Sequence, residues 1–508
     1  MSTLLGFYLG LHDSNVSIAA DGVVKYVKSE RITGIKHHKA DINFVRFMCQ
    51  KWGIKSVDAV AFSDGNRNGL GACKPGELWS QVEPIKDLFN VPTFCIDHHY
   101  CHILSAWPLS RLKDIDIGVV IDGRGDHDIR RTVISDPSSI RSLYIYYDKA
   151  PSMGNLLESI GYCMNLAAQP EFDVDLAGKI MGAHAYGNIQ KNFVDSINIS
   201  EIGTNYRDLF YSIPWEGKVP TATKDFFDFN NQNFKDWLSS VHKIVELETL
   251  HFFQKYTKPT DTIIYRGGCA LNVVCNNVLI NNFPNLIIPP HSYDGGLSLG
   301  TIEFLRLLLN DSEFQRDGFP YWQNDIEDEA PSLRIIKQTA KQLAEGKIIG
   351  WFQGQGAIGP RALGNRSILM NPASTNGKDM LNSRVKHRES WRPYGASISN
   401  KYTSEWFNID QESPFMLRSV QVNEDRKKNI PSVTHVDGTC RIQTVSHNDN
   451  MIFAELIDEF NLITGIPLLL NTSLNGGGQP IFASKEQCYN LLKTTDLDGI
   501  VIGNQIIH

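Results

Sequence analysis

The sequence lacks the features of several protein classes. No apolar run approaches the roughly 20 residues that a membrane-spanning helix requires, and the stretch Met1–Gly6 has no charged segment before its short apolar part. We therefore expect a cytoplasmic protein with no membrane partner. The formal net charge of −7 also lacks the positive excess that nucleic-acid-binding proteins present to phosphates, so no broad nucleic-acid-binding surface is expected.

Paired cysteines and repeats are also missing. The nine cysteines are an odd number without a Cys-x-x-Cys pair, which favours reduced structural thiols over a disulfide framework. No tandem repeat or low-complexity tract interrupts the chain. At 508 residues with 42% hydrophobic content, the chain is long enough for two to four domains with ordinary buried cores.

Strand and helix patterns alternate in the N-terminal part. Apolar runs predict strands at 4–10, 59–63, 93–97 and 117–122, and helical periodicity falls at 41–52 and 98–109. Asp21-Gly22 predicts a hairpin between two further strands in 16–30. Strands interleaved with helices predict a layered α/β domain.

The segment 151–250 is irregular, and we interpret it as an insertion that shapes a substrate cleft. After it, the alternation of strands and helices resumes. Beyond it we expect helices at 235–256, 333–345 and 449–464 and strands at 262–265, 348–353, 467–471 and 499–502. The acidic, aperiodic stretch 311–332 contains the main boundary. We therefore predict two domains, 1–325 and 326–508.

A first constellation combines histidines with aspartates. His98 and His102 are four residues apart, so a helix places both imidazoles on one face, where they can share a metal. Asp122 ends an apolar strand and Asp294 precedes a helix, positions that face the cleft of an α/β fold. Two histidines with two aspartates suit iron, zinc or manganese. The alternative interpretation is partly buried histidines, a turn residue and a helix cap.

Glycine turns form a second constellation. Gly267 and Gly268 follow a strand and lead through Asn272 into a helix, which allows either close approach to a phosphate or a simple turn. Gly10 and His12 after the first strand are equally ambiguous, with Lys36 adding positive charge further along.

A third constellation is basic. Residues 347–392 carry eight Lys or Arg against two acids, a local balance of +6 in an acidic chain. Arg361 and Arg392 lie among small or rigid neighbours, and with Lys386, Arg441 and the stretch Asn471–Ser473 they can form a pocket for phosphate, which arginine contacts through a planar fork. A solvated charged face is the alternative.

Taken together, these segments resemble the NodU/CmcH-type O-carbamoyltransferases. The resemblance rests on the stretches 359–367, 386–394, 436–444 and 471–473, and on the upstream His-Asp, Asp-His-His-x-x-His, Asp-Gly, Gly-Lys-x-Met-Gly and Gly-Gly-Cys-Ala-Leu-Asn segments in the same order. It implies an actin/hexokinase-like (ASKHA) ATPase-fold domain followed by a YrdC-like α/β domain. It also implies that carbamoyl phosphate and ATP give carbamoyl-adenylate, and that the carbamoyl group then moves to a hydroxyl.

The resemblance also implies roles for individual residues. His98, His102, Asp122 and Asp294 would hold iron(II) or another divalent metal, with Mg-ATP as co-substrate. His12 would be the general base, in an acceptor cleft that we extend to His184. Adenylate contacts in the N-terminal domain would come from Gly267, Gly268, Asn272 and Lys36. Carbamoyl phosphate, ATP and the adenylate would be bound in the C-terminal domain by Arg361, Lys386, Arg392, Arg441, Asn471 and Ser473, with Arg361 and Lys386 taking part in catalysis.

Three functions remain to be distinguished. The first is carbamoyl transfer to a small hydroxyl compound such as a sugar, an antibiotic or a nucleoside or nucleotide, and the sequence does not decide among these acceptors. The second is threonylcarbamoyl transfer to tRNA, which requires a basic face that the acidic total disfavours. The third is a non-catalytic nucleotide-binding regulator, which is not expected to keep both sets of residues. The sequence leaves a homodimer open.

Overall fold

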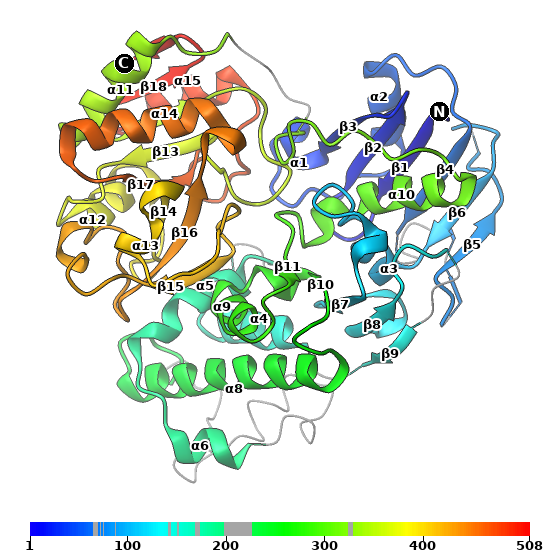
Figure 1. Ribbon diagram of the computed structural model, residues 1–508, viewed down its shortest axis with the longest axis horizontal. Helices are drawn as coiled ribbons and strands as arrows, with labels where there is room; N and C mark the ends of the chain where they lie inside the picture. Colours follow the sequence, from blue (N-terminus) through cyan, green and yellow to red (C-terminus); the bar gives the residue numbers. More distant parts are fainter. Residues whose placement is uncertain are drawn as a thin grey trace. The chain divides into compact units, whose positions relative to one another are not determined.

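A computed structural model describes residues 1–64, 70–71, 73–74, 76–86, 88–140, 144–149, 152–167, 173–197, 226–323 and 329–508. The chain forms two compact units. Unit 1 comprises Met1–Val24 and Lys39–Arg316, and unit 2 comprises Lys25–His38 and Asp317–His508. Figure 1 shows the elements in chain order.

Unit 1 begins with the strands of a mixed sheet ordered β3-β2-β1-β4-β6-β5, of which β3 passes at Lys25 into the segment that groups with unit 2. Strand β1 pairs antiparallel with β2 and parallel with β4. Its strands are β1 (Leu4–Tyr8), β2 (Asn15–Ala20), β3 (Val23–Lys28), β4 (Ala59–Ser63), β5 (Trp79–Val82) and β6 (Thr93–Ile96). The turn between β2 and β3 is Asp21-Gly22, both residues having positive φ (51° and 79°), as the sequence predicts for a tight hairpin. Helix α10 (Leu297–Leu309) packs against β1, β2 and β4.

A second sheet completes unit 1 in the order β11-β10-β7-β8-β9. Its strands are β7 (Ile117–Ile121), β8 (Arg131–Ser135), β9 (Tyr144–Asp148), β10 (Ile263–Arg266) and β11 (Leu286–Ile287). Strand β10 runs parallel to β7, so both strands end at the same edge. The other helices of this unit are α2 (Ile42–Lys51), α3 (His98–Leu104), α4 (Met153–Cys163), α5 (Leu176–Ala183), α6 (Lys191–Ser196), α8 (Gln232–Tyr256) and α9 (Val273–Asn282).

Unit 2 is built on one mixed sheet ordered β15-β16-β14-β17-β13-β12-β18-β19. Its strands are β12 (Ile349–Phe352), β13 (Arg366–Met370), β14 (Gly395–Ser399), β15 (Arg418–Gln421), β16 (Thr439–Val445), β17 (Leu468–Ser473), β18 (Gly499–Ile502) and β19 (Gln505–Ile507). Its helices are α1 (Ser29–Thr33), α11 (Leu333–Ala344), α12 (Gly377–Leu381), α13 (Thr403–Trp406), α14 (His447–Thr464) and α15 (Lys485–Thr494), with a π-helical turn at Asn382–Lys386.

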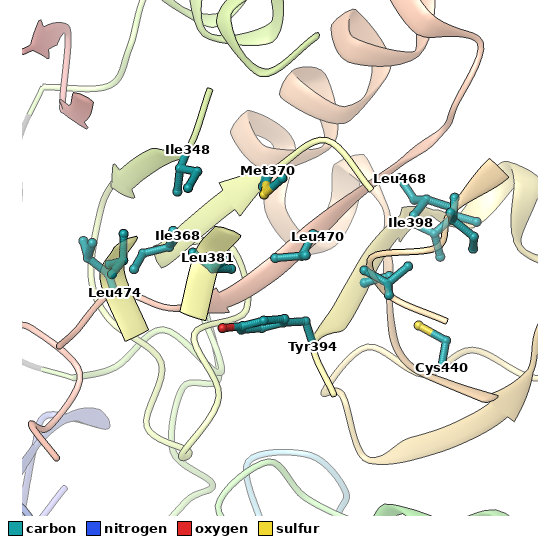
Figure 2. Packing of buried hydrophobic residues seen from close by; sticks show 14 of the residues in the cluster. Ile348, Ile368, Met370, Leu381, Tyr394, Ile398, Cys440, Leu468, Leu470 and Leu474 are labelled. Atoms are coloured by element: carbon teal, nitrogen blue, oxygen red, sulfur yellow. The ribbon is translucent and has the colours of Figure 1, made fainter. Parts of the chain in front are cut away.

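Alternation along the strands separates two cores in unit 2. Leu469 and Val445 face one way and pack with α11 and α14, whereas Leu468, Leu470 and Ile442 face the other way. Figure 2 shows this second core, where Leu470, Ile398 and Tyr394 belong to the same apolar cluster. Burial on both faces fixes the strand register, because a slip of one residue would exchange the two faces.

The register brings polar residues together on one face of this sheet. Arg441 in β16 pairs with Gly395 in β14, which pairs with Asn471 in β17. Two residues further along β16 and β14, Gln443 pairs with Ser397. Side chains in one row of a sheet point to the same face, so residues far apart in the sequence form a continuous polar row.

The division into units differs from the predicted 1–325 and 326–508. Unit 2 starts at Asp317 and also takes up Lys25–His38. Tyr26 forms a β-bridge with Gln323, and Arg31 donates to the Ile481 carbonyl at 2.7 Å, so this early segment is held by C-terminal residues. The predicted boundary and the predicted insertion fall in part on 324–328, 168–172 and 198–225, which lie outside the described residues. Among the described helices, none combines the length and apolarity needed to cross a lipid bilayer.

Candidate active sites

Four predicted metal ligands of unit 1 come together from three places in the chain. His98 and His102 lie on α3, which begins where the Asp97 carboxylate accepts from the Tyr100 N–H at 3.0 Å. Asp122 directly follows β7, and Asp294 opens the 3₁₀ turn Asp294–Gly296 before α10. All four side chains are buried, and one ligand atom from each lies within 4.8 Å of the others.

The carboxylates of this quartet face both imidazoles. Asp122 Oδ2 lies 3.2 Å from His98 Nε2 and 3.0 Å from His102 Nε2. Asp294 Oδ1 lies 3.5 Å and 3.4 Å from the same two nitrogens. Two nitrogen and two oxygen donors therefore converge on a single point.

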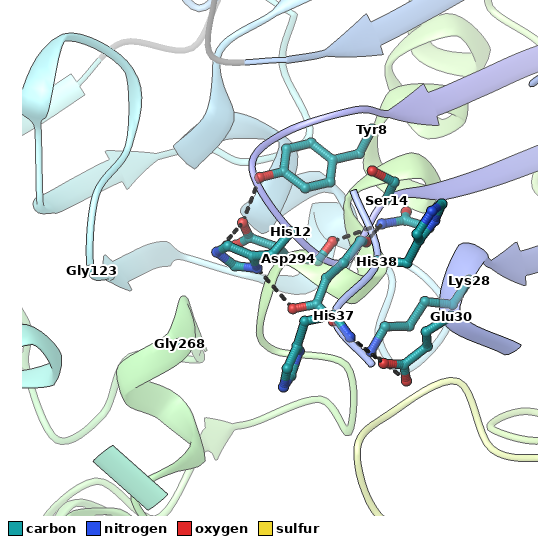
Figure 3. A network of polar contacts seen from close by, with 12 residues as sticks. Tyr8, His12, Ser14, Lys28, Glu30, His37, His38, Gly123, Gly268 and Asp294 are labelled. Atoms are coloured by element: carbon teal, nitrogen blue, oxygen red, sulfur yellow. Dashed lines mark hydrogen bonds and ion pairs between the residues drawn. The ribbon is translucent and has the colours of Figure 1, made fainter. Parts of the chain in front are cut away.

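Neighbouring groups hold the remaining carboxylate oxygens. Asp122 Oδ1 accepts from the backbone N–H groups of Gly123 at 2.7 Å and Gly268 at 3.0 Å. The Tyr8 hydroxyl donates to Asp294 Oδ2 at 2.6 Å (Figure 3). These contacts orient the ligand oxygens before any ion binds, as outer partners do in metal sites.

Burial and charge act against each other in the quartet. Burial lowers the pKa of the His98 imidazole, but the Asp294 and Asp122 carboxylates outweigh burial and raise that pKa to well above its ordinary value. Burial raises the pKa of Asp122, but the hydrogen bonds from His102 and His98 outweigh it and leave that pKa well below its usual range. The quartet therefore favours charged carboxylates.

The donor set fits a divalent metal. Imidazole nitrogens with carboxylate oxygens suit iron, zinc or manganese, and a set of four without thiolates suits an open site better than a closed structural zinc site. His98, His102, Asp122 and Asp294 would be the protein ligands. Which metal they hold, and the iron(II) implied by the resemblance, remain predictions.

The predicted base His12 lies beside this quartet. Its Nε2 is 3.7 Å from Asp294 Oδ2, and its Nδ1 is 2.8 Å from the buried Asp13 carboxylate (Figure 3). The side chain is 22% exposed. An imidazole oriented by a carboxylate and open to solvent on one side is the arrangement that a general base requires.

The predicted glycine turn lies at the edge shared by β7 and β10. Gly267 has φ of 94°, and a Cβ there would lie 2.3 Å from the Ile121 carbonyl oxygen, so no other residue fits. Gly268 contacts the quartet through Asp122. Asn272 caps α9, accepting from the N–H groups of Val274 and Cys275. Its contact with a nucleotide remains a prediction.

His184, predicted for the acceptor cleft, belongs to a separate network. Its ring stacks on that of His242, with the centroids 4.0 Å apart and the planes at 9°. His242 Nε2 lies 3.1 Å from Asn272 Nδ2, and its Nδ1 lies 3.1 Å from Glu246. The role of His184 in an acceptor cleft remains a prediction.

The predicted basic residues cluster in unit 2. Lys386 Nζ donates to the Ser473 carbonyl at 2.9 Å and to Asn475 Oδ1 at 2.6 Å. Arg441 lies in the polar row of β16, where a Cβ on Gly395 would be 3.2 Å from its Nε. Gly395 thus leaves the space through which the Arg441 side chain passes.

Positive charges dominate the electrostatics of this cluster. Burial lowers the pKa of Lys386 to well below its ordinary value, and the charges of Arg388, Arg392 and Lys36 lower it further. Burial, followed by the charge of Arg361, does the same to the pKa of Arg441. Since a shift of this kind marks a cation that lacks enough negative charge around it, the cluster is prepared for an anion.

Lys36 lies in the segment Lys25–His38, which groups with unit 2, and its charge is one of those that lower the pKa of Lys386. Its loop is anchored in unit 2, because Glu30 accepts from the His37 N–H at 3.0 Å and pairs with Lys28 at 2.9 Å (Figure 3). The resemblance implies that Lys36 contacts the adenylate in the N-terminal domain, and that contact remains a prediction.

Asn471 and Ser473 play supporting parts in this structure. Asn471 is fully buried, and its Nδ2 donates to Ser397 Oγ at 2.8 Å, which in turn donates to Gln443 at 2.7 Å. Ser473 Oγ lies 3.4 Å from Lys386 Nζ and donates to Asn475 Oδ1 at 2.7 Å. Direct contact of Asn471 and Ser473 with a substrate remains a prediction.

Sequence reasoning missed two neighbours of these sites. Tyr8, which positions Asp294, lies inside an apolar strand and gives no polar signal. Arg388 lies in the basic stretch 347–392, and its charge acts on Lys386. The sequence places Tyr394 six residues after Arg388, and in the structure the Arg388 guanidinium lies over the Tyr394 ring. This nearby aromatic residue is the sequence feature that could have indicated a fixed arginine.

Comparison with known proteins identifies a family for this chain. The family description "Carbamoyltransferase N-terminus" matches residues 70–302, and "Carbamoyltransferase C-terminus" matches residues 340–508. Nodulation protein NolO of Bradyrhizobium diazoefficiens is 30% identical over 80% of this chain and 78% of its own length. The chain belongs to the carbamoyltransferase family.

Membership of this family confirms the resemblance to the NodU/CmcH-type O-carbamoyltransferases and the prediction that the protein is an enzyme that transfers a carbamoyl group. The carbamoyltransferase also resembles nodulation protein NolNO of Sinorhizobium fredii, with 29% identity over 98% of this chain and 79% of that protein.

Among solved structures, the activator of the 2-hydroxyisocaproyl-CoA dehydratase from Clostridium difficile matches with 11% identity and a TM-score of 0.36, over 61% of this chain and 96% of that one. The fold class follows from the sheets of this protein, which combine parallel and antiparallel strands with helices.

Proposed function

We propose that this carbamoyltransferase is an ATP-dependent O-carbamoyltransferase that works in two steps. In the first, carbamoyl phosphate is hydrolysed to carbamate and phosphate, and the carbamate oxygen attacks the α-phosphorus of ATP. Carbamoyl-adenylate forms and pyrophosphate leaves. In the second, an acceptor hydroxyl attacks the carbamoyl carbon, the bond to the adenylate oxygen breaks, and AMP leaves.

One observation carries this proposal: Lys386, whose Nζ is held by Asn475 Oδ1 at 2.6 Å, and Arg441, in the polar row of β16, are buried among other cations, whose charges lower the pKa of both. Joining carbamate to ATP requires anionic phosphates to share one site, and fixed cations lower the barrier by stabilising that charge. Arg361 and Lys386 are the catalytic residues in this proposal. Arg392, Arg441 and Lys36 bind phosphate, and Asn471 and Ser473 complete the site.

The second step uses the residues around His12. His12 takes the proton of the acceptor hydroxyl, and Asp13 holds the imidazole in place. His98, His102, Asp122 and Asp294 would hold a divalent metal, which would supply Lewis-acid chemistry beside His12. Gly267, Gly268 and Asn272 contact the adenylate. The acceptor is a small hydroxyl compound, and His184 belongs to its cleft.

The folds implied by the resemblance are part of the same proposal. Unit 1 corresponds to the ASKHA-type domain and unit 2 to the YrdC-like domain. The chain order of the two family matches, N-terminal at 70–302 and C-terminal at 340–508, supports this assignment.

Pyrophosphate release tests the first step. Purified protein with ATP, carbamoyl phosphate and magnesium is expected to release pyrophosphate, and Arg361→Ala is expected to abolish the release. His98→Ala is expected to keep it and to lose transfer, measured as a carbamoyl mass gain on sugar and nucleoside acceptors. Unchanged release by Arg361→Ala would overturn the assignment of the first step to unit 2.

A further inference from the structure

Asn272, which precedes α9 in unit 1, has an amide whose orientation is fixed by the helix that it caps. Its Oδ1 accepts from the N–H of Val274 at 3.2 Å and from the N–H of Cys275 at 3.1 Å. An amide oxygen accepts hydrogen bonds and an amide nitrogen donates them, so the two ends of the side chain cannot exchange places. The cap therefore decides that Nδ2 is the atom that meets His242, 3.1 Å from its Nε2.

This contact decides where the hydrogen of the His242 ring lies. Because Asn272 Nδ2 is a donor only, His242 Nε2 must accept and carries no hydrogen. The single hydrogen of the neutral imidazole is then on Nδ1, which lies 3.1 Å from Glu246 Oε1, four residues along α8. Glu246, His242 and Asn272 thus form a chain of hydrogen bonds with one direction.

Glu246 is held as a carboxylate at the outer end of this chain. Its side chain is 9% exposed, and Lys243 Nζ lies 2.9 Å from its Oε2. Burial raises the pKa of Glu246, but the hydrogen bond and charge of His242, followed by those of Lys243, outweigh burial and leave that pKa below its ordinary value. A charged acceptor binds the Nδ1 hydrogen more strongly than a neutral one, which fixes the tautomer of His242.

The plane of the His242 ring is fixed as well. The ring is fully buried, and the ring of His184 lies parallel to it, with the centroids 4.0 Å apart and the planes at 9°. The 3₁₀ turn His184–Tyr186 is attached to α8 because the Ser239 hydroxyl donates to the His184 carbonyl. Rotation of the His242 ring would therefore displace this turn.

We propose that His242 is a positioning residue for nucleotide binding by unit 1: it holds one hydrogen of Asn272 Nδ2 and leaves the second for a polar atom of the adenylate. Glu246 acts one step further out, by fixing the tautomer of His242. An amide that is already oriented loses less conformational entropy on binding than one that rotates. The inference rests on the proposed contact between Asn272 and the adenylate, whereas the tautomer follows from the hydrogen bonds alone.

Nitrogen-15 NMR of the full chain tests the tautomer. With labelled histidine at about pH 8, where an ordinary imidazole is neutral, we expect hydrogen on Nδ1 of His242 and none on Nε2. His242→Gln identifies the signal among those of the 15 histidines. Asn272→Asp keeps an oxygen for the helix cap but replaces the donor Nδ2 by an acceptor, so we expect hydrogen to appear on Nε2. A histidine that only fills space would not respond in this way.

Calorimetry with AMP, the nucleotide that leaves in the proposed second step, tests the effect on binding. His242→Phe keeps a ring against His184 but removes the acceptor, and AMP affinity is expected to fall by about three- to tenfold. His242→Gln returns an acceptor oxygen and is expected to recover most of the affinity. In an Asn272→Ala background, His242→Phe is expected to cause no further loss, because both residues act through one contact.

His251→Phe is the matched control, since it makes the same substitution at an exposed position of α8 and is expected to change AMP affinity by less than about twofold. If His242→Phe does not fold, the NMR comparison of Asn272→Asp with the natural protein decides.

Three results would overturn the inference and leave the adenylate contact of Asn272 intact. They are hydrogen on Nε2 of His242 in the natural protein, a folded His242→Phe protein that binds AMP as tightly as the natural one while Asn272→Ala binds it more weakly, and additive losses in the double variant. Unchanged AMP affinity in Asn272→Ala would instead remove the proposed adenylate contact, and the inference with it.

Discussion

The two groups of charged side chains in this enzyme are opposite in how they balance their charge. In unit 1, Asp122 and Asp294 meet His98 and His102 at 3.0 to 3.5 Å, so donors and acceptors complement one another within the protein. In unit 2, the charges of Arg388, Arg392 and Lys36 all act on the buried Lys386 and lower its pKa, so like charges lie near one another.

This difference shows which group depends on a ligand. The quartet of unit 1 is stabilised by its own hydrogen bonds and offers four ligand atoms to a cation. The cluster of unit 2 holds like charges in a partly buried place, where an absent counter-ion costs stability. In the proposed function, the first group binds a metal and the second binds phosphate.

The largest expected effect comes from a substitution within the quartet of unit 1. Asp122→Asn keeps the shape of the side chain but removes the carboxylate that both imidazoles face, so manganese affinity is expected to fall by at least about 100-fold. Binding of carbamoyl phosphate is expected to stay within about twofold, because the cluster of unit 2 is untouched.

Electron paramagnetic resonance of titrated Mn²⁺ measures the first quantity and calorimetry the second. Asp128→Asn is the control, since this aspartate is 49% exposed and pairs with Arg124. An Asp122→Asn protein that keeps the natural manganese affinity would contradict the quartet as a metal site.

A smaller effect concerns how the stability of unit 2 depends on pH through Lys386. The pKa of Lys386 is lowered in the folded protein, so between that pKa and the ordinary value of 10.5 the unfolded chain binds more protons. Stability without ligand therefore rises with pH in this window, by at most about 1.4 kcal/mol per pH unit. Lys386→Met is expected to remove this rise.

Urea unfolding at a series of pH values from 7 to 10 measures the difference in slope between the two proteins. Lys401→Met, in which an exposed lysine paired with Asp458 is removed, is expected to leave the slope unchanged. Equal slopes for the natural and Lys386→Met proteins would mean that the charge of Lys386 is balanced within the fold.

Much of this architecture is predictable from local sequence. The Asp21-Gly22 hairpin, strand 59–63 and helix 98–104 follow from turn chemistry and periodicity that act over a few residues. The spacing of His98 and His102 also fixes their shared face. Asp122 and Asp294 could be added because parallel strands in such folds end at one edge.

Other features depend on contacts across the chain and leave no local signal. Lys36 joins Lys386 because Arg31 and Tyr26 attach their segment to unit 2. The stacking of His184 on His242 depends on how α8 packs, and no spacing in the sequence predicts it. Arg388 resembles any surface arginine until the Tyr394 ring beneath it is known.

The smallest expected effect separates geometry from charge. Gly395→Ala changes no charge, but its Cβ would lie 3.0 Å from the Arg441 carbonyl oxygen, 3.2 Å from Nε and 3.3 Å from Nη2, so the guanidinium must shift by a few tenths of an ångström. We expect phosphate affinity to fall by about three- to tenfold, which calorimetry with carbamoyl phosphate measures.

Gly178→Ala is the control, because no described atom lies within 4 Å of its Cβ. If Gly395→Ala binds as tightly as the natural protein, the charge of the cluster alone holds the phosphate. Loss of affinity at constant charge would instead show that the orientation of Arg441 matters as much as its charge.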